Sequence, residues 1–63
     1  MNIFGWTKER LAEALREHDI PRFRADQIIR WMYQRGAASF DVMDNLAKPL
    51  RIRLAEQFSI ERP

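Results

Sequence analysis

Acidic side chains are the first candidates for chemistry, because two nearby carboxylates can act as a general acid and a general base. Helical spacing pairs Glu9 with Glu13, Glu13 with Glu17, and Asp41 with Asp44. The glutamates alternate with arginines in a segment whose opposite side is apolar, and this pattern is typical of a solvated, salt-bridged helix surface. The spacing of the carboxylates therefore favours a solvated helix surface over an acid–base pair.

Other catalytic side chains are scarce. The chain of 63 residues has no cysteine, a single histidine (His18) and only two glycines, which are too far apart for a phosphate-binding loop. Without cysteine there is no thiolate zinc site, no iron–sulfur cluster and no cysteine nucleophile. His18 ends an apolar helical stripe, so we expect a half-buried or helix-terminal histidine. The composition therefore predicts a binding or docking module, and it argues against an autonomous enzyme.

Arginine and aromatic residues give a stronger signal. Four arginines and one aspartate lie between residues 20 and 35, and a second basic group lies between residues 48 and 53. The planar guanidinium matches phosphate geometry better than an ammonium does. On a helical wheel, Arg24, Trp31 and Arg35 border one side of the apolar stripe, whereas Arg30 and Tyr33 border the other.

Arginines beside aromatic rings are typical of surfaces that bind nucleic-acid backbones and unpaired bases. In the alternative interpretation, Trp31 completes the core, and the arginines are ordinary helix-forming residues on a solvent-exposed surface. The candidate nucleic-acid contacts are Arg22, Arg24, Arg30, Trp31, Tyr33, Arg35, Lys48 and Arg51.

Three helices must position these residues. Thr7 is suited to cap the first helix, and Pro21 ends it because the residue before a proline leaves the α region. Gly36 ends the second helix, and Pro49 is tolerated only in the first turn of the third. Ser39 is expected to cap a short turn in the connector between them. Apolar residues at helical spacing place the three helices at about residues 8–18, 24–35 and 47–58.

These stripes predict a single small all-α domain, a bundle of three to four helices that buries three apolar faces. Residues 59–63 are expected to form an extended tail or the start of a linker. No apolar run is long enough to span a membrane, and the first residues lack the features of a signal peptide, so we expect a cytoplasmic protein. The expected core is Leu11, Leu15, Ile20, Phe23, Ile28, Ile29, Met32, Phe40, Met43, Leu46, Leu50, Leu54 and Phe58.

The stretch from Phe23 to Gly36 reads Phe-Arg-Ala-Asp-Gln-Ile-Ile-Arg-Trp-Met-Tyr-Gln-Arg-Gly. It resembles the N-terminal accessory domain of RlmN-type radical-SAM RNA methyltransferases, in which the pattern is Phe-Arg-x-x-Gln-apolar-x-x-Trp-apolar-Tyr-x-Lys/Arg-Gly. The similarity continues through residues 39–43 and 45–54 and covers roughly residues 7–60. Two positions depart from it: Ala47 stands where a helix-capping serine is frequent, and Asp44 replaces a threonine or serine.

The resemblance implies that residues 1–63 are an N-terminal accessory domain, similar to a helix-hairpin-helix fold, truncated before a radical-SAM barrel. Such enzymes methylate C2 of adenine in large-subunit ribosomal RNA, and the RlmN type also modifies certain transfer RNAs. Their S-adenosylmethionine and 4Fe-4S cluster belong to the barrel, so no cofactor is expected in this chain. The implied partners are RNA and the radical-SAM domain of the same polypeptide. We expect a monomer with no membrane contact.

Two functions remain open. In the first, the domain engages RNA: its cationic side chains contact phosphates, and Trp31 or Tyr33 stacks on a base. In the second, it is a protein-docking module that orients the catalytic barrel without touching RNA, and Trp31, Tyr33 and Phe40 form an apolar patch. A free-standing helix-turn-helix protein would need a recognition helix dense in base-reading residues, which this sequence lacks.

Overall fold

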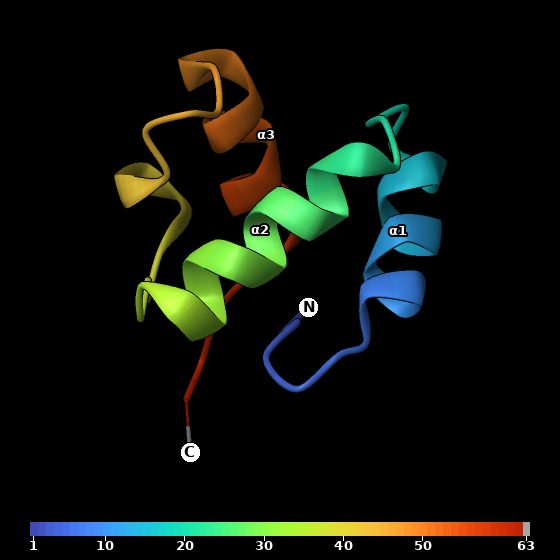
Figure 1. Ribbon diagram of the computed structural model, residues 1–63. Helices are drawn as coiled ribbons and strands as arrows, with labels where there is room; N and C mark the ends of the chain where they lie inside the picture. The colour runs from blue at the N-terminus through green and yellow to red at the C-terminus, as the bar shows by residue number, and fades with distance from the viewer. Residues whose placement is uncertain (63) are drawn as a thin grey trace.

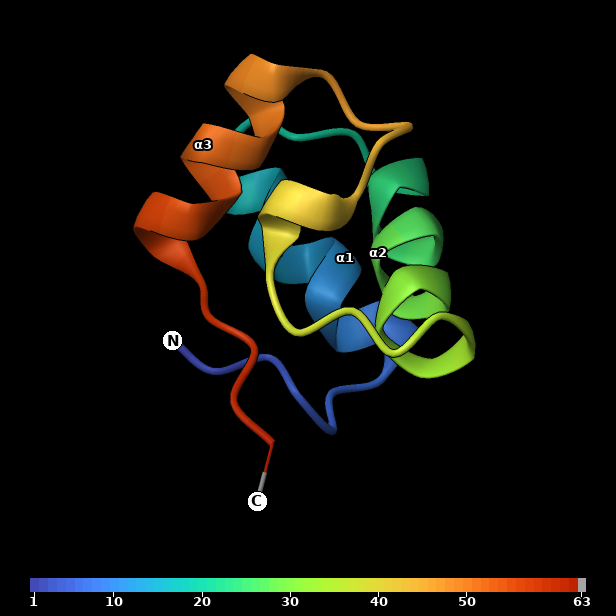
Figure 2. The same ribbon diagram turned by 90° about the vertical axis from the view of Figure 1, so that its left-hand side faces the viewer.

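The chain forms three α-helices and one short 3-10 helix in a computed structural model that describes residues 1–62. The α-helices and the 3-10 helix are, in order, α1 (Lys8–Glu17), α2 (Phe23–Gln34), η1 (Phe40–Val42) and α3 (Lys48–Gln57). Helix α1 packs against α2, and α3 packs against η1, so that two pairs of elements face each other (Figures 1 and 2). The predicted all-α bundle is confirmed.

The ends of α1 are set by local hydrogen bonds. Thr7 caps its N-terminus as predicted, because its Oγ1 accepts a hydrogen bond of 3.1 Å from the backbone N–H of Arg10. At the C-terminus, Asp19 adopts a left-handed conformation with φ of 59°. The N–H of Ile20 then donates to the carbonyl of Leu15, which is the bond of a Schellman motif. The Schellman motif at Asp19 and Ile20 therefore ends α1, and the predicted effect of Pro21 on the preceding residue is not what ends it.

The other helix boundaries follow turn chemistry only in part. Gly36 has a φ of +67° directly after the C-cap of α2, and Pro49 lies in the first turn of α3, so both predictions are confirmed. Ala47 is the N-cap of α3 and offers no capping side chain. Ser39 precedes η1, but its side chain makes no capping hydrogen bond, so the predicted cap is wrong.

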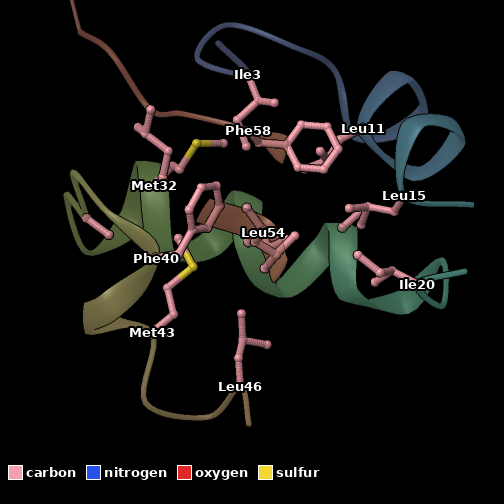
Figure 3. Close-up of a cluster of buried hydrophobic side chains, with 14 of the residues drawn as sticks. Ile3, Leu11, Leu15, Ile20, Met32, Phe40, Met43, Leu46, Leu54 and Phe58 are labelled. Carbon is pink, nitrogen blue, oxygen red and sulfur yellow. The ribbon is translucent and has the colours of Figure 1, made fainter. Parts of the chain in front are cut away.

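The core lies between the two pairs of elements (Figure 3). Ile29 and Leu50, which were predicted to be buried, are half-buried and pack against it. Sequence reasoning missed Ile3 and Ile60, whose segments are too short to show any periodicity. The predicted core residues that are buried are Leu11, Leu15, Ile20, Ile28, Met32, Phe40, Met43, Leu46, Leu54 and Phe58.

Phe23 is the one large error in the predicted core, because 58% of its surface is exposed. The predicted second helix begins at about residue 24, and Phe23 was predicted to be buried in the core just before it. In the structure α2 begins at Phe23. Residues two apart in a helix are about 200° apart around its axis, so Phe23 points away from the face on which Ala25 is buried.

The two ends of the described chain lie side by side (Figure 2). The Asn2 Oδ1 accepts hydrogen bonds from the N–H groups of Phe4 and Glu61 at 3.0 and 2.9 Å, and its Nδ2 donates to the Glu61 carbonyl at 3.1 Å. The N–H of Ile3 donates to the carbonyl of Ser59 at 2.9 Å. Residues 59–61, part of the segment 59–63 that was predicted to be a tail or the start of a linker, pair with residues 1–3 in this structure; residue 63 lies outside the described residues.

Because Leu15 is buried and Phe23 is exposed, we expect their substitution by alanine to affect stability differently. Leu15→Ala removes a fully buried side chain and should lower the free energy of unfolding by about 2–5 kcal/mol. Phe23→Ala should change it by less than about 1 kcal/mol, because the ring is exposed. Urea unfolding followed by circular dichroism measures both, and equal losses for the two variants would contradict the placement of Phe23.

Candidate nucleic-acid interface

The outward side of α2 and the segment between η1 and α3 form a cleft of about 480 Å³. It contains both charged and amide side chains, together with one indole ring. Of the predicted contact residues, three meet here, namely Arg30, Trp31 and Arg35. The complete lining is Gln27, Arg30, Trp31, Gln34, Arg35, Asp44 and Asn45.

Trp31 is held in place from two directions. Its indole Nε1–H donates a hydrogen bond of 2.6 Å to Oδ1 of Asn45, which ties α2 to the segment before α3. The guanidinium of Arg35 lies 4.9 Å from the centre of the ring. The ring is half-buried and packs against the core, as the interpretation of Trp31 as a core residue expects in part; its contact with nucleic acid stays a prediction. A ligand in the cleft therefore meets a fixed aromatic ring and a cation beside it.

Tyr33 lies outside this cleft. Its hydroxyl accepts a hydrogen bond of 2.7 Å from the backbone N–H of Gly5, and its ring centre is 5.4 Å from that of Phe4. The guanidinium of Arg62 lies 4.9 Å from the Phe4 ring and donates to the carbonyl of Met32 at 2.8 Å. Tyr33 thus belongs to the contacts that join the N-terminal segment to the end of α2.

The guanidinium groups of Arg24 and Arg30 differ in their burial and in the contacts that they make within the domain. Arg24 is half-buried, donates a hydrogen bond of 2.9 Å to Gln27 and stacks on the Phe23 ring. Arg30 forms an exposed ion pair with Asp26 at 3.1 Å, four residues earlier in the same helix. Such an exposed pair contributes little to stability, so a phosphate can compete with Asp26 for the guanidinium of Arg30.

The remaining predicted cations are dispersed. Arg22 is exposed at the start of α2, and Lys48 is exposed at the first residue of α3. Arg51 is half-buried and donates a hydrogen bond of 2.7 Å to the carbonyl of Asp41 in η1. The guanidinium of Arg51 therefore fastens α3 to η1, which gives this residue a structural task that the sequence did not reveal.

Sequence reasoning missed the polar residues that complete the cleft. Asp44 and Asn45 lie in an irregular connector, where no periodicity shows which side chains approach α2. The apolar patch that the docking interpretation required is not formed, because Phe40 is only 3% exposed and Tyr33 contacts Phe4 instead. This part of the alternative is wrong.

No arrangement for metal chemistry occurs within residues 1–62. They hold no group of three or more His, Cys, Asp or Glu side chains that could bind a metal ion, and the chain has no cysteine for an iron–sulfur cluster. His18 is the C-cap of α1, and its ring packs edge-on against Phe58 at 5.5 Å. None of the helices in this part of the chain is long and apolar enough to cross a membrane.

These observations define the class: a small all-α module with a cationic, partly aromatic helix surface. The sequence profile described as "Ribosomal RNA large subunit methyltransferase N-terminal domain" matches residues 1–60, and the chain belongs to this family. The resemblance inferred from the stretch between Phe23 and Gly36 is confirmed.

The similar proteins are much longer than this chain. It is 47% identical over 62 residues to the dual-specificity RNA methyltransferase RlmN of Granulibacter bethesdensis, covering 98% of this chain and 16% of that protein. It is 45% identical over 62 residues to the dual-specificity RNA methyltransferase RlmN of Acidiphilium cryptum, again covering 98% of this chain and 16% of that protein. The crystal structure of a radical SAM methyltransferase from Sphaerobacter thermophilus superposes with a TM-score of 0.88 at 37% identity, covering 95% of this chain and 18% of that one. The chain therefore spans about a sixth of the length of its curated relatives.

The different tasks of Arg51 and Arg35 lead to a stability prediction. Arg51→Gln removes a charge-assisted hydrogen bond to a backbone carbonyl and should lower the free energy of unfolding by about 1.5–3 kcal/mol. Arg35→Gln removes an exposed cation stacked on Trp31 and should cost about 1 kcal/mol or less. Thermal unfolding of the two variants tests this, and a larger loss for Arg35→Gln would contradict it.

Proposed function

We propose that this chain is the RNA-engaging N-terminal domain of a radical-SAM methyltransferase of the RlmN type. The complete enzyme would methylate C2 of adenine in large-subunit ribosomal RNA and in certain transfer RNAs. S-adenosylmethionine and the 4Fe-4S cluster would be bound outside this chain, because the chain has no cysteine to ligate iron. The domain itself takes no part in the chemical step.

The observation that carries this proposal is the convergence of Arg30, Trp31 and Arg35 in one cleft. Two guanidinium groups beside a fixed indole ring offer donors for phosphate oxygens and a flat surface for a base or ribose. The amides of Gln27 and Gln34 add neutral donors and acceptors on the same side of α2. RNA presents phosphates, 2′-hydroxyls and unpaired bases together, which fits this mixture of groups.

The proposed binding is electrostatic and weak for the isolated domain. A surface that contacts a few phosphates releases few counterions, and its affinity falls with salt in proportion to the number of contacts. Affinity for the complete substrate would then come from joining this domain to the catalytic domain, since two linked sites reinforce each other through effective concentration.

A charge reversal in the cleft tests the proposal. Arg35→Glu should weaken binding of a labelled ribosomal-RNA hairpin by about tenfold or more, because a charge-assisted contact is replaced by repulsion. The slope of log affinity against log salt should become shallower by roughly 0.7–0.9 for each phosphate that the variant no longer neutralises. Fluorescence anisotropy of the chain at several salt concentrations measures both quantities.

The matched control is Arg10→Glu, which changes the net charge equally. Arg10 lies on α1 beside Glu13 and Glu17, away from the α2 cleft. We expect this variant to lose much less affinity than Arg35→Glu. Equal losses of RNA affinity for the two variants would show that only the net charge of the domain matters, and they would contradict a binding site in the cleft. Unchanged RNA binding by Arg35→Glu, with a lower melting temperature of the complete methyltransferase, would favour the docking function instead.

A further inference from the structure

Phe23 is the most exposed aromatic side chain in the part of the chain that the structure describes, at 58% compared with 47% for Tyr33. A single exposed apolar residue is ordinary on a protein surface and needs no function. Phe23 differs because of its neighbours, which are cations that hold the ring and border the hollow beside it.

The ring is held by a cation on one face. The guanidinium carbon of Arg24 lies 4.7 Å from the centre of the Phe23 ring, and Arg24 is fixed in turn by its 2.9 Å hydrogen bond to Gln27. With 58% of its surface exposed, Phe23 still offers ring surface to a planar ligand. Because the ring and its cation are already ordered, a base that stacks there loses little of its binding free energy to ordering the protein.

A surface hollow of about 410 Å³ adjoins the ring, and its lining is Lys8, Arg22, Phe23 and Asp26. Lys8 and Arg22 outnumber the single carboxylate of the hollow, Asp26, which pairs with Arg30 at 3.1 Å in the absence of RNA. An apolar side chain of a protein partner would leave both cations without a counter-charge. A nucleotide satisfies all three groups, because it places a flat base on the ring and its phosphates near the cations.

The position of Phe23 on α2 connects this hollow with the cleft. Residues 23, 27, 30 and 34 of a helix lie within one narrow sector around its axis, so Phe23 shares the outward side of α2 with Gln27, Arg30 and Gln34. The rise from residue 23 to residue 30 is about 10 Å. A single strand can therefore contact the hollow and the cleft together.

We propose that Phe23 is a stacking platform for an unpaired RNA base, whose flanking phosphates contact Lys8 and Arg22. This inference rests on the proposed function and adds a second contact point to it, at the opposite end of α2. Phe23 offers more exposed ring surface than Trp31, which is half-buried, and than Tyr33, whose ring packs on Phe4.

The experiment compares two probes of equal length: a labelled single-stranded oligoadenylate and an abasic ribose–phosphate strand. Phe23→Leu keeps an apolar side chain but removes the aromatic face. It should weaken binding of the oligoadenylate by about fivefold or more, the lower end of what one stacked base contributes, and leave binding of the abasic strand unchanged. Phe23→Trp should retain or strengthen binding of the oligoadenylate. Circular dichroism confirms that each variant is folded.

The outcomes separate this inference from the function on which it rests. If Phe23→Leu binds the oligoadenylate like the parent chain, or weakens both strands equally, stacking on Phe23 is excluded. If Arg35→Glu still weakens RNA binding in that case, the proposed function survives without this site. If the parent chain binds neither strand at low salt, the inference fails, and it fails together with the proposed function only if the ribosomal-RNA hairpin is not bound either. A lower melting temperature of the complete enzyme with unchanged RNA binding would assign Phe23 to protein docking and overturn the inference.

Discussion

The side-chain amide of Asn2 joins the two ends of the described chain, and the closure of the core depends on this junction. A chain of about 60 residues buries only about 60% of the surface that it exposes when unfolded, so three short helices leave a core that is difficult to cover. Ile3 and Ile60 complete the cover and are both buried. Asn2 holds this cover in place because it bonds both the N–H and the carbonyl of Glu61, the residue that follows Ile60.

The same need for closure divides the arginines into two groups. Arg51, Arg53 and Arg62 each donate to a backbone carbonyl of another segment, and so they connect separate parts of the chain. Arg30 and Arg35 make no such bond and lie in the α2 cleft. A count of basic residues along the sequence therefore overstates the binding surface, because part of the positive charge holds the fold together.

Local patterns predicted the helices and most of the core, because helical periodicity repeats over ten or more residues. They failed where a single residue of register or a distant contact decides the outcome. Beginning α2 at Phe23 turns that side chain outward by about 200° from Ala25. The bonds from Trp31 to Asn45 and from Arg51 to Asp41 join separate segments, and no local pattern encodes them. Arg30, Trp31 and Arg35 of the cleft lining were therefore among the predicted contacts, whereas its four other lining residues were not.

The exposure of Phe23 is difficult to explain by stability alone. Burying a phenylalanine side chain contributes about 1.5–3 kcal/mol, whereas a cation stacked on an exposed ring contributes about 0.5–1 kcal/mol. A domain with so small a core forgoes stability by leaving this ring in solvent. Trp31 shows the other arrangement on the same helix, with its N–H bonded and its ring against the core. One aromatic residue thus supports the surface of α2, and the other remains free to bind at its end.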